Sequence, residues 1–147
     1  MKISAKCDYA CRALLELTLQ NETKKPVRVS WIAERQDVPL KYLVQILNQL
    51  KRAGLVVSER GRSGGYYLGR SPDKITLGEV IRSIEGPLLS INCLDGNSRT
   101  RCSIESSCTL KQAWDELKVA MENVADSITF KDICDNLKST QRVIYHI

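Results

Sequence analysis

The stretch SWIAERQDVPLKYLVQILNQLKRAGLVVSERGRSGGYYLGR, residues 30–70, predicts the fold of the chain. Its apolar spacing indicates a short helix over 30–36 and a longer one over 39–53. Pro39 suits the first turn of the longer helix, and Gly54 suits the position just past its end. Two helices joined by so short a turn form a helix-turn-helix, the motif that places its second helix in the DNA major groove.

A predicted hairpin follows these helices directly. Apolar runs of strand character, LVV at 55–57 and YYL at 66–68, flank a Gly-rich turn that carries Arg60 and Arg62. A hairpin in this place is the wing of a winged helix, and the small residues in its turn would let the backbone approach a duplex. Arginines that only keep the surface soluble are the alternative. Together with the preceding helices, the wing favours DNA binding.

Basic residues concentrate in the same part of the chain. Residues 24–74 hold eleven Lys or Arg and four acids, a net charge of +7, whereas the other residues sum to −2. Such a basic half suits contacts to DNA phosphates, although many basic faces are simply solvated. The candidate residues for base edges or phosphates are Lys41, Tyr42 and Gln45 on the second helix, with Arg60 and Arg62 for the adjacent minor groove.

Further elements are expected before this motif. Apolar residues recur at helical spacing over about 4–20 and indicate a first helix. Val27 and Val29 are expected in a short strand, which ends where Ser30, a good N-cap residue, starts the next helix.

Three more helices are expected after the wing. Thr76 and Glu79 form a capping box for a helix over 76–85, and Thr129 and Asp132 begin a last short helix. Between them one apolar stripe runs over more than four turns, comprising Leu110, Ala113, Trp114, Leu117, Met121 and Val124. This stripe is longer than the core of a small winged domain requires, so it is well suited to dimerisation. The alternative is a helix that packs back onto its own domain.

The predicted fold class is therefore mainly α with a small β wing. We expect a winged helix-turn-helix DNA-binding domain over 1–87, a cysteine-bearing loop over 88–108, and a dimerisation helix with a C-terminal helix over 109–140. The N-terminal stretch lacks the features of a signal peptide and no run is long and apolar enough for a membrane span. We expect a cytoplasmic protein with no membrane partner.

The segment CLDGNSRTRCSIESSC places Cys93, Cys102 and Cys108 in a polar loop, with the spacing C-x8-C-x5-C. Zinc sites usually draw on paired cysteine knuckles, which this segment lacks. Wide, irregular spacing fits an iron-sulfur cluster better, because its ligands surround a larger object. The residues alone leave three interpretations open: a metal centre, a thiol switch or coincidence.

The chain resembles, from Met1 to about Lys138, a family of bacterial winged-helix repressors that includes IscR, NsrR, RirA and CymR. The matching stretches are MKISAKCDYACRALLEL, PLKYLVQILNQLKRAGLV, ERGRSGGYYLGR and ITLGEVIRSIEGP, followed by the three cysteines and a Trp-containing helix. The resemblance implies a homodimeric transcription regulator that binds an operator in double-stranded DNA. In cluster-binding members it also implies an iron-sulfur cluster held through Cys93, Cys102 and Cys108.

The fourth ligand differs among members of that family. In IscR a histidine follows the third cysteine by three positions, and Lys111 stands there in this chain. In NsrR an aspartate early in the first helix, from the other subunit, completes the site, and Asp8 stands at the matching place. The resemblance therefore implies Asp8 as fourth ligand, with neighbouring Cys7 as the rival. Three thiolates and one carboxylate favour a 4Fe-4S cluster over 2Fe-2S, sensing nitric oxide, redox or iron status.

Two other functions compete with a cluster-binding regulator. A cluster-free, CymR-like regulator of cysteine metabolism that acts with a partner protein is the alternative within the family. A thiol oxidoreductase would need a C-x-x-C motif, which the chain lacks, and no Gly-rich phosphate loop or Cys-His couple is evident. We therefore do not expect an enzyme.

Overall fold

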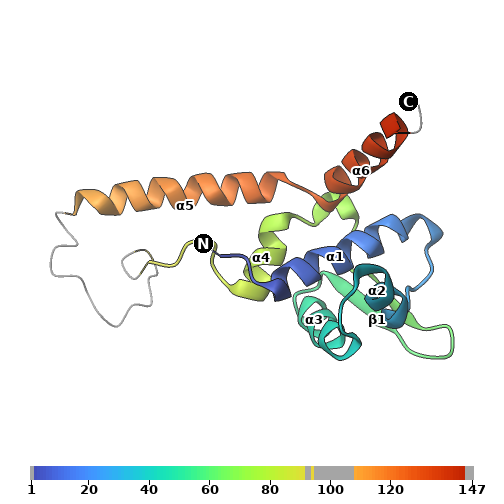
Figure 1. Cartoon of the computed structure of the whole chain (residues 1–147). Helices are drawn as coiled ribbons and strands as arrows, with labels where there is room; N and C mark the ends of the chain where they lie inside the picture. The colour runs from blue at the N-terminus through green and yellow to red at the C-terminus, as the bar shows by residue number, and fades with distance from the viewer. Residues whose placement is uncertain (1, 92–93, 95–107, 145–147) are drawn as a thin grey trace.

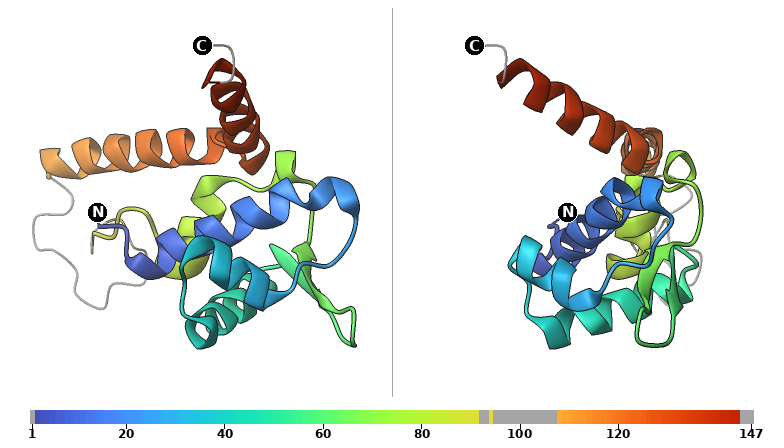
Figure 2. Two further views of the ribbon diagram at one scale, coloured as in Figure 1. Left: turned by 45° about the vertical axis from the view of Figure 1, so that its right-hand side comes forward. Right: turned by 90° about the vertical axis from the view of Figure 1, so that its right-hand side faces the viewer.

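The computed structural model describes residues 2–91, 94 and 108–144 of the chain (Figure 1). A head is formed by α1 to α4 with the hairpin, and the long helix α5 runs past α4 and beyond it. The left view of Figure 2 shows the same projection of α5, and both views show α6 leaving the C-terminal end of α5 in another direction. The elements in chain order are α1 (Ala5–Leu19), η1 (Asn21–Thr23), α2 (Val29–Gln36), α3 (Leu40–Arg52), β1 (Val56–Glu59), β2 (Gly65–Leu68), η2 (Pro72–Lys74), α4 (Leu77–Glu85), α5 (Thr109–Ser127) and α6 (Phe130–Ile144).

The core of the head is built around α1, which packs against α2, α3, α4 and α6. Apolar side chains on one face of α1 and one face of α3 are fully or almost fully buried, and burial of each such leucine stabilises the fold by about 1.5–3 kcal/mol. The buried core comprises Ala10, Ala13, Leu14, Leu17, Ile32, Ala33, Val38, Leu43, Ile46, Leu47, Leu50, Leu55, Val56, Leu68, Ile75, Val80 and Phe130. Because Phe130 begins α6, the C-terminal helix shares the core of the head.

The helix-turn-helix is confirmed, with small corrections at its start. Val29 lies in α2 and not in a strand, and α2 is preceded by Arg28 as N-cap, so Ser30 does not cap it. The extended segment is limited to Val27, which bridges Tyr66 of the wing, and Arg28, whose φ of −68° and ψ of 137° are extended. In α3, Pro39 is the N-cap, and Gly54 follows the helix with a positive φ of 72°.

The predicted hairpin is also present, as the antiparallel pair of β1 and β2. Its register pairs Val56 with Leu68 and Glu59 with Gly65, so the turn spans 60–64. An isolated antiparallel bridge between Val27 and Tyr66 adds a short third segment along β2. The wing is thus held by the connection before α2 as well as by its own strands.

The last three helices keep the predicted order. Both hydrogen bonds of the capping box of α4 form, from Glu79 N to Thr76 Oγ1 and from Thr76 N to Glu79 Oε2, each at 3.2 Å. The helix predicted to be short at the C-terminus is longer, since α6 runs over 15 residues to Ile144. The chain around Thr129 pairs with Thr76 as an antiparallel bridge, which fixes the junction of α5 and α6 against the start of α4.

Candidate nucleic-acid interface and cysteine site

The face of α3 opposite the core carries the predicted reading residues. Lys41 and Gln45 are exposed and lie one turn apart, so their side chains share this face. Tyr42 is half-buried, and its ring meets that of Tyr9 on α1 edge to face, with centroids 6.0 Å apart and planes at 85°. The arrangement leaves two polar side chains free to reach a duplex and seats the third residue against α1.

The turn of the wing presents Arg60 and Arg62 in exposed positions. It is closed by a hydrogen bond from Gly64 N to Gly61 O at 3.1 Å. Gly61 has a φ of 120°, and a Cβ on Gly64 would overlap the carbonyl oxygen of Glu59, so the turn needs glycine at both positions. The tight turn places two guanidinium groups at the end of the hairpin.

The cysteine site is described only at its last member. Cys108 is the N-cap of α5 and is half-buried, whereas Cys93 and Cys102 lie outside the described residues. Within the described parts of the chain, no three Cys, His, Asp or Glu side chains converge on a point where they could hold a metal ion. Figure 1 shows the N-terminal end of α5 well away from the head of its own chain.

The two candidates for a fourth ligand occupy different environments on α1. Cys7 is fully buried, and burial, followed by the nearby carboxylate of Glu85, raises the pKa of its thiol. The side chain of Asp8 is 49% exposed, and its Oδ2 lies 2.9 Å from Arg12 Nη2 in an ion pair one helical turn long. The guanidinium of Arg12 also lies 5.9 Å from the ring centroid of Tyr9.

A buried carboxylate connects α1 to the end of α2. Glu16 is only 3% exposed, and its Oε1 accepts hydrogen bonds from Gln36 Nε2 at 2.6 Å and Arg35 Nε at 3.3 Å. Its Oε2 has no hydrogen-bond partner among the described residues. The first helix is therefore fixed to both helices of the DNA-binding motif, through Glu16 at α2 and through Tyr9 at α3.

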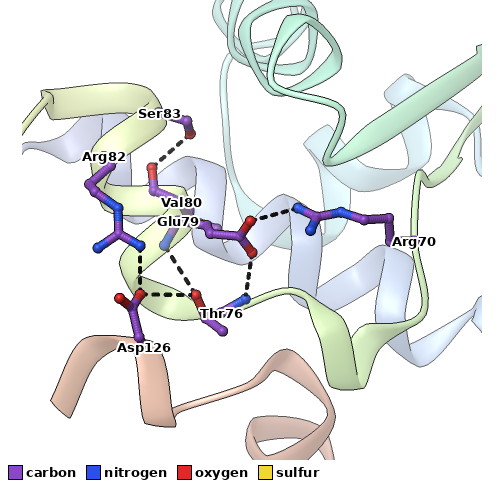
Figure 3. A network of polar contacts seen from close by, with 7 residues as sticks. All are labelled: Arg70, Thr76, Glu79, Val80, Arg82, Ser83 and Asp126. Atoms are coloured by element: carbon purple, nitrogen blue, oxygen red, sulfur yellow. Dashed lines mark hydrogen bonds and ion pairs between the residues drawn. The ribbon is translucent and has the colours of Figure 1, made fainter. Parts of the chain in front are cut away.

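A polar network that sequence reasoning missed joins the head to the long helix (Figure 3). Asp126 near the end of α5 accepts from Arg82 Nη2 at 2.6 Å and from Thr76 Oγ1 at 3.3 Å. The helices come so close here that a Cβ on Gly78 would overlap Asp126 Oδ1. At a separate point on α4, Gln49 Nε2 of α3 donates to Ser83 O at 2.7 Å. Helix α4 thus contacts α3, the predicted reading helix, and the long helix α5 through separate polar groups.

A helix-turn-helix with a basic reading face, followed by a wing that ends in arginines, defines a winged-helix DNA-binding protein. The model of the Rrf2 family, described as an iron-dependent transcriptional regulator, matches residues 3–136. The chain belongs to this family of transcriptional regulators. The predicted family and fold are confirmed, and so is the expectation that the protein is not an enzyme.

Known relatives include both CymR and IscR regulators. CymR of Bacillus subtilis (strain 168) is 34% identical over 133 residues, which cover 90% of this chain and 89% of CymR. IscR of Aliivibrio salmonicida (strain LFI1238) is 33% identical over 133 residues, 90% of this chain and 77% of IscR.

The similar solved structures also include both a CymR and an IscR. The structure of B. subtilis CymR, the global cysteine regulator, has a TM-score of 0.75 and 32% identity, and covers 92% of this chain and 98% of that one. T. potens IscR has a TM-score of 0.74 and 34% identity, and covers 96% and 91%. The likeness therefore does not distinguish an IscR type from a CymR type. No described helix has the length and apolar character needed to span a membrane.

Proposed function

We propose that the chain acts as a homodimeric repressor whose operator binding is controlled by an iron-sulfur cluster. Cys93, Cys102 and Cys108 of one subunit and Asp8 of the partner subunit would hold the cluster. The observation that carries this assignment is the contrast on α1 between an accessible carboxylate at Asp8 and a buried, protonated thiol at Cys7.

The dimer is proposed from the surface of α5. Leu110, Trp114, Leu117 and Val124 are 61%, 39%, 44% and 62% exposed, and their spacing of three and four residues places them with Met121 on one face. A continuous exposed apolar face of this kind marks an interaction site. The same face continues into an apolar pocket of about 410 Å³ between α4 and α5, where Ile81 and Met121 are among the lining residues. A second copy of α5 is the occupant that such a symmetric contact would require.

The choice of Asp8 over Cys7 follows from accessibility and protonation. A ligand supplied to another subunit must be reachable from outside the head, and Cys7 is fully buried. A thiol must also lose its proton to bind iron, which the raised pKa of Cys7 opposes. Asp8 is half-exposed, and using it as a ligand breaks the ion pair with Arg12, which at an exposed position contributes only about 0.3–0.5 kcal/mol.

The donor set also fits the charge of the proposed group. Three thiolates and a carboxylate give a site of high negative charge, and Cys108 stands at the positive end of the 19-residue helix α5. When bound, a cluster with one oxygen ligand supplies an iron site that reacts with nitric oxide or oxygen, or loses iron, more readily than an all-thiolate site.

Residues of α1 connect Asp8 with the helix proposed to contact DNA. If Asp8 turns to the other subunit, Arg12 loses its partner while it still lies beside Tyr9, whose ring contacts Tyr42 on α3. A change at Asp8 therefore acts on residues that seat the reading helix. Regulation then requires only that cluster-bound and cluster-free dimers hold their two heads differently.

At the operator, two heads would place their reading helices in successive major grooves about 34 Å apart. Lys41, Tyr42 and Gln45 are proposed to contact base edges or nearby phosphates. Arg60 and Arg62 are proposed to enter the adjacent minor groove or to bind its backbone, and this contact should weaken as salt is raised.

Anaerobic purification of the parent protein and of Asp8→Ala, with visible spectroscopy and counts of iron and sulfide, tests the ligand assignment. Asp135→Ala is the matched control, because Asp135 forms an equivalent i,i+4 ion pair with Lys131 on α6, at 2.5 Å. We expect the parent and the control to carry the same cluster and Asp8→Ala to carry an altered or unstable one. Spectra that are identical in all three proteins would remove Asp8 from the ligand set.

A second candidate is a cluster-free regulator of cysteine metabolism that acts with a partner protein. The likeness to B. subtilis CymR favours it as much as the likeness to T. potens IscR favours a cluster. Iron-free, colourless protein from iron-supplied cells, with DNA binding that responds to a partner protein, would support this candidate over the first.

A further inference from the structure

We infer that Arg28 is a positioning residue that holds the turn of the wing in its DNA-facing conformation. Arg28 lies before α2, and its Nη2 donates a hydrogen bond to the carbonyl oxygen of Arg62 at 3.1 Å, across 34 positions of sequence. The bond ends on the backbone of the turn that presents Arg60 and Arg62. This inference rests on the proposed role of those two arginines at the operator.

The segment that carries Arg28 is itself fixed to the hairpin. Val27 N donates to Tyr66 O at 2.8 Å, and Tyr66 N donates to Val27 O at 2.9 Å, an antiparallel pair on the outer side of β2. This approach needs glycine in the neighbouring position of β2, because a Cβ on Gly65 would lie 2.5 Å from Val27 O. The backbone at Arg28 is thus held in place, and its side chain has a short, defined path to the turn.

The turn, by contrast, has little packing of its own. Its residues from Arg60 to Ser63 are exposed, and Gly61 with its positive φ leaves the backbone free to adopt other conformations. A guanidinium hydrogen bond to its backbone restricts these conformations before DNA arrives. Pre-ordering a binding loop strengthens binding because the complex then loses less conformational entropy.

Direct contact between Arg28 and a phosphate is the competing role, and a double-mutant cycle separates the two. The probe is a DNA duplex selected from a random pool by the parent protein. Arg28→Gln should weaken its binding by about three- to tenfold, the loss expected for one hydrogen bond that orders a loop. In the Arg60→Gln/Arg62→Gln background the same change should have no further effect. Lys25→Gln is the matched control, because it removes a charge from the same connection.

A second measurement does not depend on DNA. In the free protein, Arg28→Gln should accelerate amide hydrogen exchange at Gly61 to Gly64 while the midpoint of thermal unfolding stays unchanged, and Arg28→Lys should restore part of the protection. Unchanged exchange in the turn would overturn the inference.

Two outcomes of the DNA measurements separate this inference from its rivals. If Arg28→Gln still weakens binding in the double-arginine variant, and lowers the salt slope by about 0.9, Arg28 binds a phosphate directly and the inference fails. If the double-arginine variant binds DNA as tightly as the parent, the proposed role of the wing fails instead. The exchange data then still decide whether Arg28 orders the turn.

Discussion

Tyr9 on α1 and Tyr42 on the reading helix α3 meet edge to face, with their ring centroids 6.0 Å apart. Tyr9 directly follows Asp8, and Tyr42 lies between the exposed reading residues of α3. The contact therefore joins the helix proposed to respond to the cluster with the helix proposed to read DNA. The carboxylate of Asp8 and the ring of Tyr9 are linked through a single side chain, because Arg12 contacts both of them.

This contact should be measurable as a coupling between the two rings. Replacing Tyr9 and Tyr42 by leucine, singly and together, should give a coupling free energy of unfolding of about 0.5–1.5 kcal/mol, the usual value for an aromatic pair. Tyr9→Phe keeps the ring and should keep the coupling. Strictly additive effects in the double mutant would show that the rings do not interact in solution.

The proposed dimer face can be tested with two substitutions on opposite sides of α5. Leu117 is 44% exposed and lies on the apolar stripe, while Val119 is 47% exposed and lies on the opposite side of the helix. Leu117→Glu should shift the protein to monomers in sedimentation velocity, because two buried carboxylates would face each other across a two-fold contact. Val119→Glu should leave the dimer intact. Equal behaviour of the two variants would place the interface elsewhere.

The close approach of α4 and α5 predicts that Gly78→Ala destabilises the head. A Cβ there would overlap Asp126 Oδ1, so the carboxylate must move and its hydrogen bond from Arg82 is disturbed, for which we expect a cost of about 1–3 kcal/mol in unfolding free energy. The loss should exceed the gain of about 1 kcal/mol that alanine brings to a helix. In an Asp126→Ala background the obstruction is gone, so Gly78→Ala should then be neutral or stabilising. Chemical denaturation of the parent, both single variants and the double variant measures these changes. An equal loss of stability from Gly78→Ala in both backgrounds would contradict the predicted overlap with Asp126.

The thiols on α1 and α6 should be unreactive in the cluster-free protein. Burial raises the pKa of Cys11 to about 12, and it also raises the pKa of Cys7 and Cys134 above the ordinary value of 9.0. At pH 7.5 these groups are protonated and should react slowly with iodoacetamide, as residue-resolved mass spectrometry can measure. Urea-unfolded protein should react fully, and fast modification of the folded protein would contradict the burial of these thiols.

The same pKa shifts predict how stability depends on pH. The unfolded chain releases thiol protons near pH 9, whereas the folded chain holds them to higher pH. The stability they contribute is therefore complete below pH 9 and is lost as pH rises toward 12. Cys11→Ala should reduce this alkaline loss in urea titrations at successive pH values. An unchanged alkaline profile in this variant would assign the loss to other groups.

Much of the head was predictable from sequence, because residues that begin or end its helices act on the backbone next to them. Pro39 and Gly54 bound the reading helix, and Thr76 with Glu79 starts α4, because each acts through the backbone of its own turn. The extended segment before α2 was less predictable, since its one ladder partner, Tyr66, lies 39 positions away from Val27. A pairing with so distant a partner leaves no signal in the sequence around Val27.

The polar contacts between elements were not predictable in the same way. Arg82 and Asp126 are 44 positions apart, and nothing in either neighbourhood marks them as partners. Gly78 was the one local signal, because a glycine within a predicted helix is consistent with close approach of another element. For the cysteine loop, Cys93 and Cys102 lie outside the described residues, so the ligand set stays a prediction from the sequence.

The central claim is that the cluster decides how tightly the dimer holds DNA, and one comparison of affinities tests it most directly. Binding to a selected duplex would be measured anaerobically for cluster-loaded protein, for the same sample after nitric oxide, and for cluster-free protein. We predict at least a tenfold difference between loaded and cluster-free dimers, about 1.4 kcal/mol of coupling, and a much smaller difference in Asp8→Ala. Equal affinities for loaded and cluster-free parent protein would contradict the account.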